Sequence, residues 1–172
     1  DPIGMKDTSY QREPWFEGRI AIPADAQGEW LKPRFAPEPV ASDLLYTTPS
    51  DYARFMLSVM RNEGLRSAIA AERSRVQFSL RPVICPKVAT GSCPEEVGPG
   101  LGWQVVKISG KRYLTHTGHD PGLYTFGYLS ADCKSGIVIF TNGERGSQLV
   151  IPILQSIGRD QEFVEFLSSM IH

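Results

Sequence analysis

The sequence predicts an α/β protein of the α+β kind, in which an antiparallel sheet packs against a C-terminal helix and adjoins part of a helical lobe. Four strand-like apolar runs follow one another in the second half of the chain, separated by turn-forming residues. Apolar residues at helical spacing come after these strands, and a well-capped helical segment comes before them. This order favours a layered fold with helix lying across the sheet.

The first part of the chain is irregular until one sharply marked helix. Residues 1–40 contain six of the thirteen prolines and show no sustained periodicity, which predicts a long loop or lobe surface. The helix signal begins with Thr48 as N-cap, Pro49 at the first helical position and Asp51 at the capping-box position. Its apolar face is formed by Tyr52, Phe55, Met56, Val59 and Met60.

A weaker helix over residues 65–76 leads into a predicted loop that continues to residue 100. Cys85 and Cys93 bracket a stretch of this loop that contains proline and glycine, while Cys133 lies in a predicted turn. One local disulfide with one free thiol is the simplest arrangement, and it predicts an oxidising compartment, periplasmic or secreted. Three unpaired thiols in a cytoplasmic protein fit the spacing equally well.

The second half contains the predicted sheet. Residues 101–108 and 111–117 flank Ser109-Gly110 as one hairpin, and residues 123–130 and 135–142 flank a second turn. A helix is predicted over the run SQLVIPILQSI at 147–157, and a last helical segment carries Phe163, Val164, Phe166, Leu167 and Met170.

The composition excludes some classes of function. The chain has 172 residues, of which 41% are hydrophobic and 22% charged, which suits one globular domain with a sizeable core. The formal net charge is -1 at pH 7 and the charges are interspersed, so we predict no nucleic-acid partner. No apolar run approaches the roughly 20 residues of a membrane helix, so we predict no membrane span.

Four segments of the chain resemble a known superfamily in their order and spacing. The stretch THTGHDPGLYTFGYLSADCKSGIVIFTNG, at 115–143, resembles the third active-site motif of the serine β-lactamase and penicillin-recognising superfamily, nearest its class C, D-peptidase and esterase branches. The stretches DPIGMKDTS, LLYTTPSDYARFMLSVM and GLGWQVV resemble three further segments of those proteins. The resemblance implies a β-lactamase/transpeptidase-like fold and acyl transfer through a serine ester.

The resemblance also implies site residues. His116 takes the place of the lysine in Lys-Thr-Gly, where it would line the pocket and either donate to a substrate carboxylate or orient the superfamily's tyrosine, which is missing here. Thr117 would hydrogen-bond the substrate, and Gly118 would leave room for an acyl chain to lie against the strand. The backbone N–H of His119 would be one of two oxyanion-hole donors.

Other residues near this motif have two interpretations each. Tyr124 is a candidate for substrate binding, although sheet packing explains it as well. Asn142 is a candidate for substrate contact at the pocket rim, although Asn142-Gly143 also reads as a strand-to-helix turn. His119 and Asp120 beside His116 lack the spacing of common zinc motifs, so we predict no metal and no cofactor.

The superfamily's nucleophile motif, Ser-x-x-Lys, does not occur in this sequence, and neither does its Tyr-x-Asn or Ser-x-Asn element. The resemblance therefore implies the C-terminal half of such an enzyme, one incomplete domain with lobe and loops at 1–100 and strands and helix at 101–172. We expect a serine hydrolase acting on β-lactams, D-amino-acid peptides or small esters, inactive as this chain alone. The alternative is a non-catalytic binding module.

The resemblance also predicts a partner strand. In the superfamily, N-terminal strands pair with the strand that corresponds to residues 135–141, which would leave an open apolar edge here. We expect that edge to be covered by the missing N-terminal half or by a second copy of the chain.

Overall fold

The computed structural model describes residues 2–35, 37–41, 43–88, 91, 93–130 and 135–170. Five strands form one antiparallel sheet in which neighbours in the sequence are neighbours in space. The strands are β1 (Glu96–Pro99), β2 (Gln104–Ile108), β3 (Lys111–Asp120), β4 (Leu123–Ser130) and β5 (Ser135–Thr141). The predicted antiparallel sheet is thus confirmed, with one strand more than expected.

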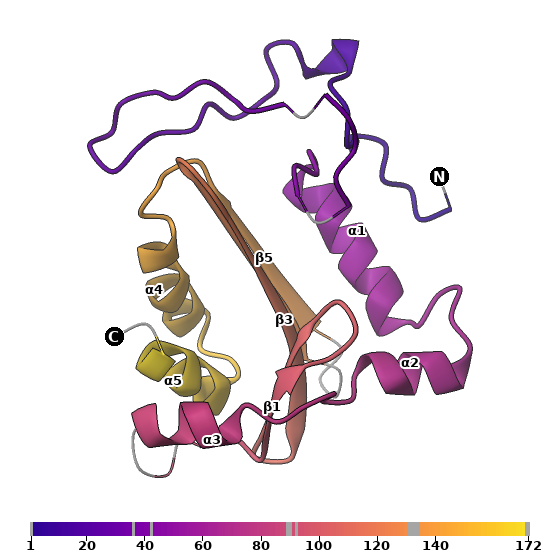
Figure 1. Ribbon diagram of the computed structural model, residues 1–172, viewed down its shortest axis with the longest axis vertical. Coiled ribbons are helices and arrows are strands. Elements are labelled where there is room, and N and C mark those ends of the chain that lie inside the picture. Colours follow the sequence, from indigo (N-terminus) through magenta and orange to yellow (C-terminus); the bar gives the residue numbers. More distant parts are fainter. Residues whose placement is uncertain are drawn as a thin grey trace.

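Helices cover both faces of this sheet (Figure 1). One side carries α1 (Pro49–Met60) and α2 (Ser67–Arg73), and the other carries α4 (Ser147–Ile157) and α5 (Gln161–Met170). The irregular N-terminal segment, which contains only the short helix η1 (Pro14–Phe16), crosses one end of the sheet. No helix in the described part of the chain combines the length and apolar character needed to cross a membrane.

Alternate residues of β3 face opposite sides of the sheet, because successive side chains on a strand point in opposite directions. Tyr113 packs with Tyr128 and Phe163 in a core shared with α4 and α5. Leu114 packs with Met56 in a second core under α1. The sheet therefore separates two hydrophobic cores, and each residue of β3 belongs to one side or the other.

The start of α1 confirms one predicted contact and corrects another. The side chain of Thr48 accepts a hydrogen bond from the backbone N–H of Asp51 at 3.1 Å, as an N-cap should. The carboxylate of Asp51 does not complete a capping box. It accepts instead from the backbone N–H of Asp7 at 2.7 Å, from Thr8 Oγ1 at 3.0 Å and from Arg54 at 2.6 Å. Asp51 therefore ties the N-terminal segment to α1.

Two elements occupy the stretch that was predicted to be a loop. These are α3 (Arg81–Ile84), with the short helix η2 (Cys85–Lys87) behind it, and β1. Both depend on residues far away in the sequence: Val97 pairs with Val106 across the sheet, and the N–H of Leu80 donates to the carbonyl of Val97 at 2.8 Å. Local periodicity carries no signal for such contacts.

Three predicted boundaries also shift. β2 starts at Gln104 instead of 101, because Gly102 has φ +75° and Gly100 N–H donates to the carbonyl of Trp103 at 2.7 Å, which closes a turn. β3 continues beyond 117 to Asp120, since it pairs with β4 up to Leu123. α2 covers 67–73 of the predicted 65–76.

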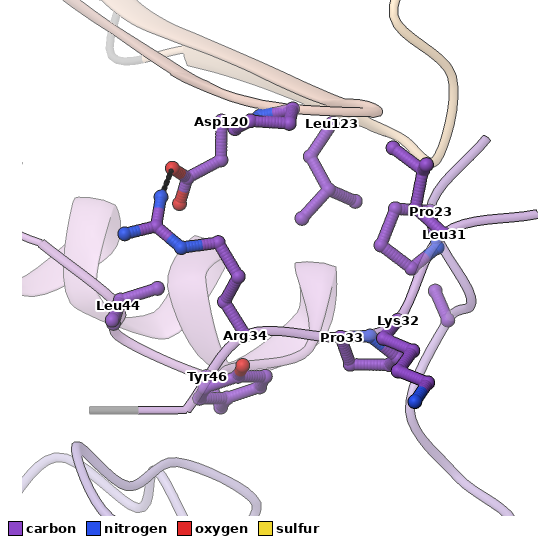
Figure 2. Close-up of a pocket in the computed structure, with 11 residues that line it drawn as sticks. Pro23, Leu31, Lys32, Pro33, Arg34, Leu44, Tyr46, Asp120 and Leu123 are labelled. Atoms are coloured by element: carbon purple, nitrogen blue, oxygen red, sulfur yellow. Dashed lines mark hydrogen bonds and ion pairs between the residues drawn. The ribbon is translucent and has the colours of Figure 1, made fainter. Parts of the chain in front are cut away.

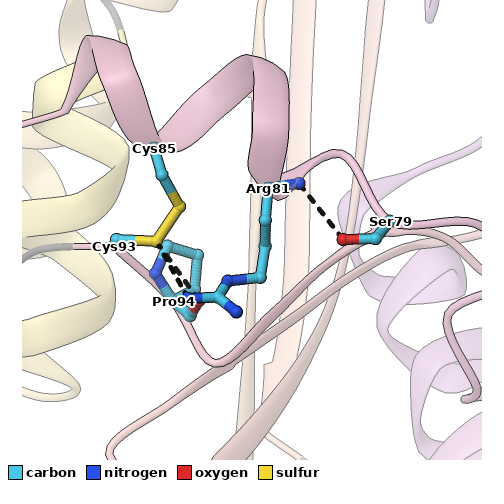
Figure 3. The surroundings of a disulfide bond; sticks show 5 residues. All are labelled: Ser79, Arg81, Cys85, Cys93 and Pro94. Atoms are coloured by element: carbon cyan, nitrogen blue, oxygen red, sulfur yellow. Dashed lines mark hydrogen bonds between the residues drawn. A yellow bond between two sulfur atoms is a disulfide. The ribbon is translucent and has the colours of Figure 1, made fainter.

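The predicted disulfide between Cys85 and Cys93 is present, with a Cα–Cα separation of 5.1 Å (Figure 3). It joins the end of α3 to the chain that enters β1, and Arg81 lies beside it, 3.6 Å from the sulfur of Cys93. Cys133 lies outside the described residues. The bond fastens α3, whose Ile84 is buried, to the sheet.

Candidate active site

An open cleft of about 1030 Å³ lies between the α1 side of the sheet and the N-terminal segment. Five of the six predicted site residues line it, namely His116, Thr117, Gly118, His119 and Asn142. Tyr124 does not line it. The cleft is therefore built around the motif at the end of β3.

His116 lies on the α1 side of the sheet, and its partner on the neighbouring strand β4 is Gly127. Its side chain is exposed to solvent, and its ring lies 6.4 Å from the ring of Trp103, edge to face. Trp103 is held in turn by stacking on Phe55 at 6.2 Å. An exposed imidazole with a fixed aromatic neighbour is available to a ligand in the cleft.

Aromatic side chains form one wall of the cleft. Tyr52 lies with its ring 5.6 Å from Phe55 and 5.6 Å from Phe140. Burial raises the pKa of Tyr52, which therefore stays a neutral phenol at physiological pH. From the sequence, Tyr52 and Phe55 are predicted only as the apolar face of a helix and Phe140 only as part of a strand. No local signal distinguishes an aromatic residue of the core from one that borders a cleft.

The second half of β3 has a free edge. The pairing of β2 with β3 ends at Gln104 opposite Thr115, whereas β3 itself continues to Asp120. Residues 116–120 pair with β4 on one side, and no other described segment forms backbone hydrogen bonds with them on the β2 side. Backbone donors and acceptors at this edge can pair with an extended ligand, as an added strand would.

Gly118 lies in the middle of this free edge. A Cβ built at this position would come within 2.5 Å of Oγ1 of Thr125 on β4. A side chain here would therefore need Thr125 to move, and it would also cover part of the exposed strand. Glycine keeps the edge accessible.

Thr117 and His119 point away from the side of His116, because they alternate with it along β3. They pair with Phe126 and Tyr124, and the ring of His119 lies 6.3 Å from the ring of Tyr124. Tyr124 packs against the core on the α4 side. The structure thus groups Tyr124 with His119 rather than with His116, and their predicted roles remain predictions.

His119 has a carboxylate partner that the sequence did not predict. Its Nε2 lies 3.0 Å from Oε1 of Glu144, and the backbone N–H of Gly122 donates to the same carboxylate at 2.6 Å. The pKa of Glu144 is lowered, chiefly by the hydrogen bond from the Gly122 N–H and further by His119. These effects outweigh burial, which acts to raise it. Glu144 therefore joins the β3–β4 turn to the residues after β5.

Asn142 joins the N-terminal segment to the end of β5. Its side-chain amide donates to the carbonyl of Ile22 at 3.0 Å, and its own carbonyl accepts from the N–H of Ala24 at 2.9 Å. Ala24 also accepts from the N–H of Glu144 at 2.9 Å. Asn142 thus lies directly after β5, before α4, and it also lines the cleft. Its contact with a substrate remains a prediction.

The residues at the end of β3 are engaged with partners other than a metal. His119 contacts Glu144, and Asp120 forms an ion pair with Arg34 at 2.7 Å. In the described ranges, no three histidine, cysteine or acidic side chains gather into a possible metal site.

The sequence from residue 1 to 154 matches the Beta-lactamase family. The chain belongs to the Beta-lactamase family. Among curated proteins, none matches the sequence at a significant level.

Solved structures show the same fold for this Beta-lactamase-family chain. A β-lactamase/D-alanine carboxypeptidase from Pseudomonas syringae is 14% identical, with a TM-score of 0.56 over 98% of this chain and 49% of that protein. A class C β-lactamase from Rhodobacter sphaeroides is 13% identical, with a TM-score of 0.59 over 98% and 50% of the two chains. An octameric penicillin-binding protein homologue from Pyrococcus abyssi is 15% identical, with a TM-score of 0.60 over 83% and 31%. The chain thus spans half or less of the length of these structures.

Proposed function

We propose that this chain forms one side of the active site of a serine hydrolase that transfers acyl groups from β-lactams, D-amino-acid peptides or small esters. The observation that supports this most is the free edge of β3 at His116–Asp120, which faces a cleft in a chain of the Beta-lactamase family. An acyl or peptide chain lying on this edge would hydrogen-bond the strand as an added partner.

Each residue of the motif has a role in this proposal. His116 donates a hydrogen bond to a carboxylate of the substrate. Thr117 hydrogen-bonds the substrate, and the backbone N–H of His119 is one of two oxyanion-hole donors. Tyr124 and Asn142 contribute at the rim, Asn142 through its fixed position beside Ile22.

The nucleophile in this proposal comes from outside these 172 residues. The sequence contains no Ser-x-x-Lys, and the superfamily's activation of serine needs that lysine. The cleft, at about 1030 Å³, is as large as the largest ligand pockets, which are about 300–1,000 Å³. It therefore has room for a substrate.

The test is covalent acylation of the isolated chain. We expect no hydrolysis of nitrocefin or p-nitrophenyl acetate and no adduct with a fluorescent penicillin, with an active class C β-lactamase as positive control. A stoichiometric adduct in the mass spectrum that disappears when one serine of this chain is mutated would contradict the proposal.

The absence of Ser-x-x-Lys also favours a second candidate, a non-catalytic binding module. The encoding gene separates the two. A Ser-x-x-Lys encoded upstream of Asp1 supports the hydrolase, and its absence supports the module.

We further propose that a strand from another polypeptide segment, either an N-terminal half or a second copy, pairs with β5. β5 pairs only with β4 among the described strands, and it carries four consecutive apolar residues, Ile137 to Phe140. Light scattering should then report an assembly larger than the 19.1 kDa of one chain. A monomer whose β5 amides exchange rapidly with solvent would contradict this.

We also propose a periplasmic or secreted location, because a disulfide such as Cys85–Cys93 seldom persists in the cytosol. Peptide mapping of exported protein without reductant should recover the two cysteines as one linked pair. Two free thiols in that material would contradict the disulfide and remove this support for the location.

A further inference from the structure

A second, smaller pocket opens beside the β3–β4 turn. Its volume is about 250 Å³. Figure 2 shows Arg34 and Asp120 on one side, Pro23 and Leu31 on the other, and Leu123 pointing into the space between them. Because pockets for whole small molecules are about 300–1,000 Å³, this one suits a single branch of a ligand.

The loop that builds this pocket is fixed by hydrogen bonds. The N–H of Leu31 donates to the carbonyl of Pro23 at 2.8 Å, and the N–H of Ala24 donates to Asn142 at 2.9 Å. Gly122, in the β3–β4 turn, lies so close to the loop that a Cβ there would be 2.7 Å from Cβ of Pro23. The pocket is therefore held in shape by contacts within the chain.

One ion pair supplies polar groups to the pocket wall. Nη1 of Arg34 lies 2.7 Å from Oδ1 of Asp120, and the two side chains are 58% and 22% exposed. A guanidinium has five N–H donors and a carboxylate has two acceptor oxygens. No hydrogen bond within the described residues uses Oδ2 of Asp120. The pair thus still offers donors and an acceptor side by side.

A primary carboxamide matches such a wall better than a charged group does. Its carbonyl accepts from Arg34 while its NH₂ donates to Asp120. A carboxylate would be repelled by Asp120 and an ammonium by Arg34, and that repulsion is stronger in a partly desolvated pocket than in water. The ammonium of Lys32 points away from the pair, as Figure 2 shows. Apart from Tyr46 and Lys32, the remaining lining residues are apolar and suit an alkyl segment.

The pocket continues from the cleft. Tyr46, Asp120 and Leu123 line both spaces. Asp120 comes four residues after His116, a distance of about 13 Å along an extended strand. A ligand paired with the free edge of β3 would therefore reach the pocket with a group that lies about this far from His116.

We propose that the small pocket is a subsite for extended acyl or peptidyl substrates whose remote branch is apolar and ends in an uncharged carboxamide. The inference rests on the proposed function, because it places the substrate along the free edge of β3. Among the substrates of the proposed function, this subsite favours longer acyl or peptidyl chains that carry an amide over small esters.

The test measures binding to the whole chain by NMR. The probes are three N-acyl-D-alanyl-D-alanine compounds with the same alkyl chain, ended by a carboxamide, a carboxylate or an isopropyl group of the same shape as the amide. Backbone amides of His116–His119 report on the β3 edge, and those of Leu31 and Leu123 report on the pocket. We expect the carboxamide probe to shift both sets and to bind about tenfold more tightly than the isopropyl probe, as two net hydrogen bonds imply.

A pair of variants isolates the role of Arg34. Arg34→Met removes the donors and should abolish the tenfold preference. Arg61→Met is the control, because Arg61 is similarly exposed, at 67%, and pairs with Glu63 outside both pockets. It should leave the preference unchanged.

The other possible outcomes each contradict a specific part of the proposal. Equal binding of all three probes at the β3 edge, unchanged in Arg34→Met, overturns the subsite and leaves the proposed function standing. Tighter binding of the carboxylate probe overturns the preference for an uncharged group. Shifts confined to the pocket, or no shifts at all, overturn the placement of substrate along β3 and the subsite with it.

Discussion

The two halves of β3 differ in how deeply their side chains are buried. On the α4 and α5 side, Tyr113 and Phe163 are 0% exposed and their rings stack at 4.2 Å. On the α1 side, Leu114 is 1% exposed, but the same strand reaches an open cleft at His116 two residues later. Thr115 is buried on the α4 side, but Thr117 and His119, which follow it on that side, are exposed as His116 is on the other. β3 therefore changes from core to binding surface after Thr115.

This difference predicts that ligand binding and the free energy of unfolding depend on different side chains, even where these are neighbours along β3. The buried residues packed with α4 and α5, here called the closed face, should affect the free energy of unfolding strongly. The exposed residues of β3 beyond Thr115, here called the open face, should affect it little, and they are the ones that can contact a ligand. The predictions below use this contrast.

The largest effect is expected from the closed face. Phe163→Ala should lower the free energy of unfolding by about 3–5 kcal/mol, because it removes a fully buried ring and leaves a cavity beside Tyr113. Urea unfolding followed by circular dichroism measures this. Phe78→Ala is the control, since Phe78 is 61% exposed and should change stability little. Similar losses in both variants would mean that the closed face is not the main core.

The disulfide should have the next largest effect. Replacing Cys85 and Cys93 together by alanine should lower the free energy of unfolding by about 2–3 kcal/mol, because the bond restricts the unfolded chain over a short loop. The same loss should follow when the unmodified chain is reduced, and reduction of the double variant should change nothing further. An unchanged midpoint on reduction would refute the contribution of the bond.

Asp51 should contribute stability that depends on pH. Burial acts to raise its pKa, but hydrogen bonds from the Asp7 N–H, Thr8 and Arg54 lower it below its usual value. The pKa is thus lower in the folded state than the unfolded value of about 3.9, so this stability is present above about pH 4 and is lost as the pH falls further.

Asp51→Asn should therefore lower the free energy of unfolding by about 1.5–3 kcal/mol at pH 7, since bonds to a buried carboxylate are lost. It should also flatten the decline in stability between pH 4 and pH 2. Thermal unfolding across this range checks both. A decline as steep as that of the unmodified chain would assign the acid sensitivity to other carboxylates.

Sequence predicted the parts of the fold whose signals are local. The alternation in β4 and β5 and the capping residues of α1 are readable in short windows, and they were confirmed. β1 was not predicted, because its four residues include glycine and proline and it forms only by pairing with β2. The carboxylate of Asp51 accepts a hydrogen bond from the backbone N–H of Asp7, which lies 44 residues away in the sequence. Capping rules describe only neighbouring residues and do not predict this contact.

In the candidate site, too, the sequence predicts local features and misses contacts between distant residues. The motif from His116 to His119 was found by resemblance, and all of it lines the cleft. The ion pair of Arg34 with Asp120 joins residues 86 apart, so no local sequence pattern predicts it. Tyr124 was predicted from proximity along the chain, while the register of β3 and β4 puts it opposite His119.

The smallest effect on stability is expected at the open face, and it is the sharpest test of the contrast. His116→Ala should change the free energy of unfolding by no more than about 0.5 kcal/mol, because the side chain is exposed and its neighbour Trp103 remains stacked on Phe55. The same variant should weaken binding of a D-alanyl-D-alanine ligand, because the ligand's carboxylate loses its donor. Thr115→Val, one residue earlier, is the matched opposite: Thr115 is 6% exposed and donates to the carbonyl of Gly127 at 3.0 Å, so this variant should lower stability and leave the affinity for that ligand unchanged. If His116→Ala proved as destabilising as Thr115→Val, the change from core to binding surface would not occur at this point of β3.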